Sequence, residues 1–101
     1  MNSEIEQKRS AVEALCRHYQ VQRLDLFGSA AAGQLQAESD IDLLVDFGPQ
    51  PTAGYAARYF ELLEGLETLF ERPVDLVVAS AVRNPYLRQS IEATKTLIYA
   101  A

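Results

Sequence analysis

Apolar residues recur along this chain at two different periods, and each period predicts a different kind of element. Over the first 20 residues they fall three or four positions apart, with charged residues between them. This spacing is typical of an amphipathic helix. The apolar positions are Ile5, Val12, Leu15, Cys16 and Tyr19. A second stripe of this kind, from about Thr52 to Glu71, predicts a longer helix that Pro73 ends.

Three short runs of large apolar and β-branched residues predict strands. They cover residues 23–27, 41–47 and 74–78. Each run has the length of an ordinary strand and is bounded by turn-forming or helix-forming residues. Between the first two runs, residues 29–32 favour one or two turns of helix, which Gly33 would end.

The last part of the chain predicts one more helix. Asn84 is a suitable N-cap, and Pro85 suits the first helical position. Tyr86, Leu87 and Ile91 would then face inward, and Thr94 could join them. Residues 96–99 fit either a fourth strand or the tail of this helix.

The order of these elements predicts a small α/β fold, in which helices cover a short mixed sheet. The chain has 101 residues, of which 49% are hydrophobic. That length is typical of a single domain, so we expect residues 1–101 to form one. A domain of this size has little chain left over for a second substrate-binding unit.

Charge and cysteine content narrow the function classes. Nine basic residues face 14 acidic ones, for a formal charge of −5. This balance argues against a protein that binds nucleic acid directly through its phosphates. A single cysteine, Cys16, cannot form an intramolecular disulfide, and the simplest expectation is a reducing, cytoplasmic compartment. No apolar run approaches the length of a membrane span, so no membrane association is expected.

Aspartates at the starts of the second and third predicted strands suggest metal chemistry. Asp40 and Asp42 are two residues apart, and side chains at that spacing on a strand point to the same face. Paired carboxylates repel each other, and a divalent cation such as Mg²⁺ removes the conflict. Asp75 lies in the third strand and could face the same site if that strand lies beside the second. Three carboxylates can hold two metal ions for phosphoryl or nucleotidyl transfer, with Asp75 the candidate general base.

The junction after the first strand is a candidate phosphate site. Gly28 allows close approach of a ligand to the backbone, and the helix predicted to follow it offers unpaired N–H groups. The Ser29 hydroxyl adds a donor, whereas Ser39 could either cap its turn or contact phosphate. A phosphate cradle beside a metal cluster suggests a nucleoside triphosphate bound with Mg²⁺.

Each of these signals has a structural explanation when it is taken alone. A Gly-Ser pair is more often a simple turn, and Asp-x-Asp is more often a solvated loop. Asp75 could be an edge-strand charge that prevents aggregation. The combination, in this order and at strand ends, is far more specific than its parts.

The run from Gly28-Ser29 through ten residues to Asp40-Ile41-Asp42-Leu43-Leu44-Val45 resembles the signature of the DNA polymerase β-like nucleotidyltransferase superfamily. The chain is most similar to its minimal nucleotidyltransferases (MNT), the antitoxins of HEPN/MNT toxin–antitoxin pairs. The resemblance implies metal-binding Asp40, Asp42 and Asp75, with Gly28 and Ser29 on the triphosphate of ATP. The implied activity is Mg²⁺-dependent transfer of AMP to a tyrosine of a HEPN ribonuclease toxin, which silences the toxin in a hetero-oligomer.

The chain departs from this family at two positions. Many relatives carry arginines in the helix after Gly-Ser, whereas this chain has Ala30 and Ala32. An arginine there could make charge-assisted contacts to phosphate. The departure motivates an alternative, a catalytically weak binding module that neutralises its partner by complex formation. A third alternative, transfer to a small molecule or RNA, fits less well with the acidic charge and the short chain.

Overall fold

The computed structural model of the chain describes residues 3–28, 40–49 and 53–101. Within these ranges the helices are α1 (Ser3–His18), α3 (Tyr55–Phe70) and α4 (Pro85–Thr94), with a short 3-10 helix, η1 (Ala79–Ala81). The strands are β1 (Arg23–Phe27), β2 (Ile41–Asp46), β3 (Val74–Val78) and β4 (Thr96–Ala100). The last of these settles the ambiguous C-terminal segment as a strand.

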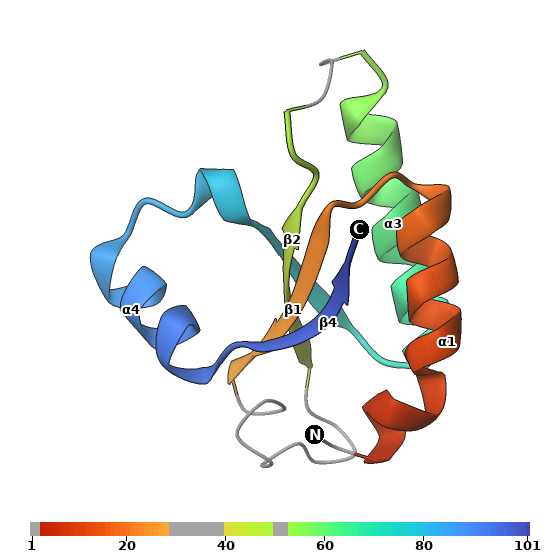
Figure 1. The fold of residues 1–101 in the computed structure, drawn as a ribbon, viewed down its shortest axis with the longest axis horizontal. Helices are drawn as coiled ribbons and strands as arrows, with labels where there is room; N and C mark the ends of the chain where they lie inside the picture. The colour runs from red at the N-terminus through yellow and green to blue at the C-terminus, as the bar shows by residue number, and fades with distance from the viewer. Residues whose placement is uncertain (1–2, 29–39, 50–52) are drawn as a thin grey trace.

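The four strands form one mixed sheet in the order β3-β2-β1-β4. β1 runs antiparallel to both β2 and β4, whereas β2 and β3 are parallel. Helices α1 and α3 lie side by side against one face of the sheet, and α4 lies on the other side (Figure 1). The predicted small α/β fold with a mixed sheet is therefore confirmed.

The main hydrophobic core lies between the sheet and the pair α1 and α3. Alternate residues of the strands point into it, and each is buried. They are Leu24, Leu26, Ile41, Leu43, Val45, Val74, Leu76 and Ile98. The Cys16 thiol lies in the same core, and burial raises its pKa to about 12. Such a thiol has almost no thiolate at neutral pH, as expected for a packing residue.

A smaller apolar cluster lies on the opposite face of the sheet, where Phe27 and Leu44 meet Val82 and Ile91. Ile91 is the buried residue of α4. The prediction that Tyr86 and Leu87 face inward is wrong, because their side chains are 82% and 39% exposed. The first turn of α4 extends away from the sheet, so only the later part of the helix packs on it (Figure 1).

Local sequence signals predicted the ends of some helices correctly and the ends of others incorrectly. The Asn84 side chain accepts hydrogen bonds from the N–H groups of Tyr86 and Leu87, which confirms the predicted cap of α4. Helix α3 begins later than predicted, with Gly54 in a left-handed conformation at its N-cap position. The predicted cap Thr52 and the predicted helix over 29–32 lie outside the described residues. In the described ranges, no helix is long and apolar enough to cross a membrane.

Candidate active site

The three predicted metal ligands come together at one end of the sheet. Asp42 in β2 pairs directly with Asp75 in the parallel strand β3, and Asp40 immediately precedes β2. Their neighbours Ile41 and Val74 are buried in the main core, so Asp42 and Asp75 point to the other face of the sheet. The expectation that Asp75 faces the same site as Asp42 is therefore met by the register of β2 and β3.

Repulsion between these carboxylates shows in the pKa of Asp42. Partial burial raises this pKa above its ordinary value, and the charges of Asp75 and Asp40 raise it further. Among the ion pairs found in the described part of the chain, none includes any of the three aspartates. The site therefore concentrates negative charge without a basic side chain to balance it, and a bound cation would remove the repulsion.

The donor set fits Mg²⁺ in its chemistry, because carboxylate oxygens are the hard ligands that this ion takes. Within residues 3–28, 40–49 and 53–101, however, no group of three or more His, Cys, Asp or Glu side chains is arranged to hold a metal ion. Asp40 and Asp75 are exposed and Asp42 is half-buried, so the outer two side chains have room to turn toward the third.

Gly28 closes the site on the β1 side. Its φ of 72° lies in the left-handed region, and a Cβ atom built there would be 2.5 Å from the Asp42 Oδ2 atom. A side chain at this position would force the Asp42 carboxylate to turn aside, and the positive φ itself favours glycine. The predicted contact of Gly28 with a phosphate stays a prediction. The other two predicted nucleotide-binding residues, Ser29 and Ser39, lie outside the described residues.

The sequence indicates that Thr94, the last residue of α4, could face inward, but not that it contacts the candidate site. Its hydroxyl oxygen accepts a hydrogen bond from the Gly28 N–H at 3.2 Å and donates one to the Ser90 carbonyl oxygen at 3.0 Å. The end of α4 is thereby tied to the start of the predicted phosphate site. A threonine near the end of a helix carries no signal for such a contact, because Gly28 is 66 residues away.

The edge strand that carries Asp75 is held by α3. The Val74 N–H donates to the Glu67 carboxylate at 3.0 Å, and the Tyr59 hydroxyl donates to the Leu76 carbonyl oxygen at 2.7 Å. Glu67 is half-buried, and a helical pattern of acidic residues gives no sign of this contact. These two contacts flank Asp75 and fix the backbone on both sides of it.

Known proteins are similar to this chain over most of its length. The profile of the nucleotidyltransferase domain family matches residues 8–98. A Methanocaldococcus jannaschii protein with the provisional name protein adenylyltransferase is 41% identical over 81 residues, which cover 80% of this chain and 78% of the relative. The protein adenylyltransferase MntA of Thermococcus cleftensis is 36% identical over 70 residues, covering 69% and 68%.

Solved structures agree with these sequence matches. A structure described provisionally as a minimal nucleotidyltransferase has a TM-score of 0.75 at 32% identity, covering 91% of this chain and 90% of that one. A complex of a tri-AMPylated HEPN toxin of Shewanella oneidensis with its MNT antitoxin has a TM-score of 0.68 at 20% identity. That match covers 95% of this chain and 72% of the other, and it shows a shared fold alone.

Proposed function

The chain belongs to the nucleotidyltransferase domain family, and we propose that it is an antitoxin that transfers AMP from ATP to a tyrosine of a partner HEPN ribonuclease toxin. The observation that carries the proposal is the pairing of Asp42 with Asp75 beside Gly28 at one end of the sheet. Two relatives are named protein adenylyltransferases, and the solved complex contains an AMPylated HEPN toxin; both support a HEPN toxin as the acceptor.

Each site residue then has a chemical role. Gly28, Ser29 and Ser39 hold the triphosphate, with backbone N–H groups and hydroxyls as donors to its oxygens. Asp40, Asp42 and Asp75 hold Mg²⁺ in what we propose is a two-metal site. When bound, Mg²⁺ supplies positive charge that offsets the charge of the phosphates and of the transition state.

The transfer forms one bond and breaks one. The oxygen of the tyrosine hydroxyl attacks the α-phosphorus of ATP, and the bond from that phosphorus to the bridging oxygen of pyrophosphate breaks. The hydroxyl proton passes to Asp75 as general base, and pyrophosphate leaves with the electron pair. The products are tyrosyl-AMP on the toxin and pyrophosphate, so no further reactant is needed.

We further propose that this chemistry takes place in the cytoplasm, in a hetero-oligomer of the single domain of residues 1–101 with its toxin. A second candidate function, neutralisation by binding alone, is favoured by Ala30 and Ala32, which remove two possible phosphate contacts. The two functions differ in whether the aspartates are needed for rescue of toxicity.

Transfer of label from ATP marked at the α-phosphate to a purified HEPN toxin tests the proposal. With Mg²⁺, the wild-type chain should label the toxin, and Asp42→Ala should reduce labelling about 100-fold or more, equivalent to roughly 2.7 kcal/mol. Glu61→Ala, which removes an exposed carboxylate of α3 on the other side of the sheet, is the control and should keep the activity. If Asp42→Ala labels the toxin at the wild-type rate, the metal assignment is wrong.

A cellular experiment separates the two candidate functions. If the chain acts by AMP transfer, the double variant Asp40→Ala with Asp42→Ala should fail to rescue cells that express the toxin. Rescue by a stable double variant would favour the binding module instead. Thermal melting of the purified variant confirms that a failure to rescue is not a failure to fold.

A further inference from the structure

The sheet face that carries Asp42 continues along the strands beyond the carboxylates. Asp42 lies between Asp75 and Phe27, and two residues further along β2, Leu44 lies beside Asp25 of β1. Each such step of two residues is about 6.6 Å along a strand. The positions beside Leu44 are therefore one step away from the aspartates, on the same side of the sheet.

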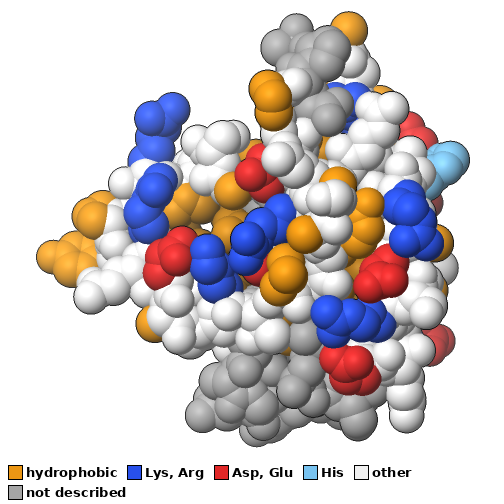
Figure 2. Space-filling model, viewed as in Figure 1, with side chains coloured by type: hydrophobic (Ala, Val, Ile, Leu, Met, Phe, Trp, Pro, Cys, Tyr) orange, Lys and Arg blue, Asp and Glu red, His pale blue; other side chains and the backbone are white. Residues whose placement is uncertain are grey.

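A cavity of about 200 Å³ lies over this part of the face, between the sheet and α4. Its base is mostly apolar, with Leu44, Ala79, Val82 and Ile91, and the buried Asp25 lies beside Leu44. Its rim is charged, and it is formed by Arg23, Asp46, Arg88, Glu92 and Lys95. Basic and acidic side chains gather together between the α4 lobe and the centre of the sheet (Figure 2).

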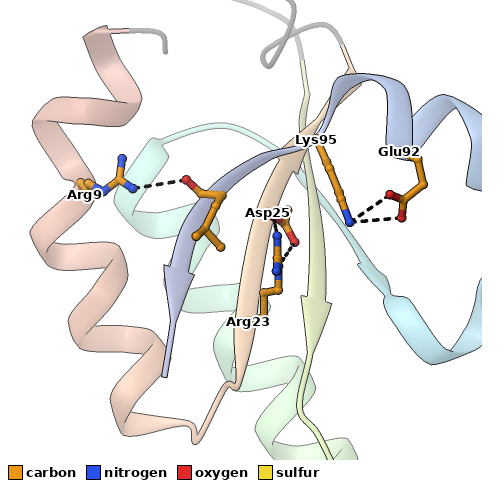
Figure 3. Close-up of polar contacts among 6 residues, drawn as sticks. Arg9, Arg23, Asp25, Glu92 and Lys95 are labelled. Carbon is orange, nitrogen blue, oxygen red and sulfur yellow. Dashed lines mark hydrogen bonds and ion pairs between the residues drawn. The ribbon is translucent and has the colours of Figure 1, made fainter.

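The basic groups of the rim already have partners. Arg23 forms an ion pair with the buried Asp25 at 2.9 Å, and Lys95 pairs with Glu92 at 3.1 Å (Figure 3). The Arg88 guanidinium donates to the Val82 carbonyl oxygen at 2.7 Å. Because each of these basic groups already has a hydrogen-bond or ion-pair partner, the rim is poorly suited to a phosphate group. Its mixed charges suit the polar backbone and side chains of a peptide.

Size and lining point to a single aromatic side chain. Cavities for whole small-molecule ligands usually measure roughly 300–1,000 Å³, so 200 Å³ is small for a complete nucleotide. Among the described residues that line this cavity, none carries an aromatic ring that could stack on a base. A tyrosine has an apolar ring for the base of the cavity and a polar tip, and its length is comparable to one two-residue step along β2.

We propose that the cavity between α4 and the sheet, based on Leu44, Ala79, Val82 and Ile91, binds the acceptor tyrosine of the partner protein. This inference rests on the proposed function. The ring packs on the apolar base, the flanking peptide contacts the charged rim, and the hydroxyl points along β2 toward Asp42 and Asp75. There the hydroxyl oxygen attacks the α-phosphorus of ATP, pyrophosphate leaves with its electron pair, and the proton passes to Asp75.

A matched pair of substitutions on the short helix η1 tests this assignment. Ala79 is half-buried and lines the cavity, whereas Ala81 is exposed and does not. Ala79→Phe fills the cavity and should reduce AMP transfer at least about tenfold, chiefly by raising the KM for the toxin. Ala81→Phe should leave transfer unchanged. Calorimetry with Mg²⁺ and ATP should give the same affinity for both variants as for the wild type.

Three outcomes would overturn the inference. An Ala79→Phe variant with wild-type kinetics would place the acceptor elsewhere. Equal loss of ATP affinity and of transfer would assign the cavity to the nucleoside. Equal loss of transfer in Ala81→Phe would mean that the whole η1 surface, and not the cavity, contacts the toxin.

A second measurement keeps the inference testable if Ala79→Phe fails to fold or if the proposed function is wrong. N-acetyl-L-tyrosinamide, titrated into the wild-type chain, should shift the methyl NMR signals of Leu44, Val82 and Ile91, whereas N-acetyl-L-alaninamide should not. If the chain transfers no AMP but these signals shift, the proposed function fails, and with it the role of the tyrosine as acceptor, although the cavity binds a tyrosine side chain. If it transfers AMP and the signals do not move, the cavity assignment fails alone.

Discussion

The two faces of the sheet are built from alternate residues of the same strands, yet they have opposite character. On the face toward α1 and α3, the strands present mainly apolar side chains, and most of these are buried. On the face toward α4, the same strands present charged residues on either side of a small apolar cluster. β2 shows the contrast within one strand, because Leu43 belongs to the first face and Asp42 to the second.

Because of this difference, residues of one strand contribute to the stability of the fold on one face and to the candidate site on the other. The first face supplies the apolar burial that drives folding. The second face can therefore carry like charges at Asp42 and Asp75, and a cavity beside Leu44, without loss of the fold. Substitutions that change one face should leave the properties of the other largely unchanged, and the following predictions test that separation.

The largest effect is expected from neighbouring leucines on β2. Leu43→Ala removes a fully buried side chain of the main core and should lower the free energy of unfolding by about 3–4 kcal/mol. Leu44→Ala acts on the smaller cluster beside an existing cavity, and should cost only about 2 kcal/mol. Denaturant unfolding of both variants measures the difference. Equal losses would show that the two faces are packed equally well.

The next effect concerns two glycines with similar backbone angles. Gly28→Ala and Gly54→Ala each place alanine at positive φ, 72° and 78°, at a cost of roughly 1–2 kcal/mol. Only at Gly28 does the new Cβ meet the Asp42 carboxylate, since nothing lies within 4 Å of the Cβ position at Gly54. We therefore expect loss of AMP transfer in Gly28→Ala alone. Comparable transfer by the two variants would contradict the role of this close approach.

The apolar face was the predictable part of the molecule. The runs at 23–27 and 74–78 coincide with β1 and β3, because buried strands are short and rich in β-branched and large apolar residues. The Asn84-Pro85 pair also predicted the start of α4, since its capping contacts reach only two or three residues along the chain. Signals that act locally in sequence were sufficient for these elements.

The face toward α4 was predicted only in part. Two-residue spacing predicted that Asp40 and Asp42 share a face, but it left Asp75 conditional on the third strand lying beside the second. The contacts that position these residues join distant segments. Thr94 reaches Gly28 across 66 residues, and a local pattern holds no information about such a contact. The helical pattern likewise predicted inward-facing Tyr86 and Leu87, because it cannot show that the first turn of α4 extends away from the sheet.

A smaller effect is expected at Thr94. Thr94→Val keeps the shape of the side chain but removes the acceptor of the Gly28 N–H, which should lower the free energy of unfolding by about 1 kcal/mol. Because the hydroxyl holds the start of the predicted phosphate site, we expect the KM for ATP to rise more than kcat falls. Thr94→Ser restores the hydroxyl and should restore the KM. If serine does not rescue it, the hydrogen bond is not what positions Gly28.

The smallest effect is the dependence of stability on pH through Asp42. Burial and the charges of Asp75 and Asp40 raise the pKa of Asp42 above its ordinary value of 3.8. The folded chain therefore keeps this proton to a higher pH than the unfolded chain does. Without Mg²⁺, the contribution of Asp42 to the free energy of unfolding falls as the pH rises from about 3.8 through the raised pKa.

Asp42→Asn removes this contribution. Its melting temperature should match that of the wild type at about pH 3 and exceed it slightly at neutral pH, since the repelling charge is gone. Added Mg²⁺ should reverse the order at neutral pH, because a cation that binds the folded wild type stabilises it, whereas the variant has lost a ligand. The opposite result would be a wild type that becomes more stable than the variant as the pH rises without Mg²⁺. It would show that the ionised Asp42 is attracted by a basic group in the folded chain and is not repelled by the other aspartates.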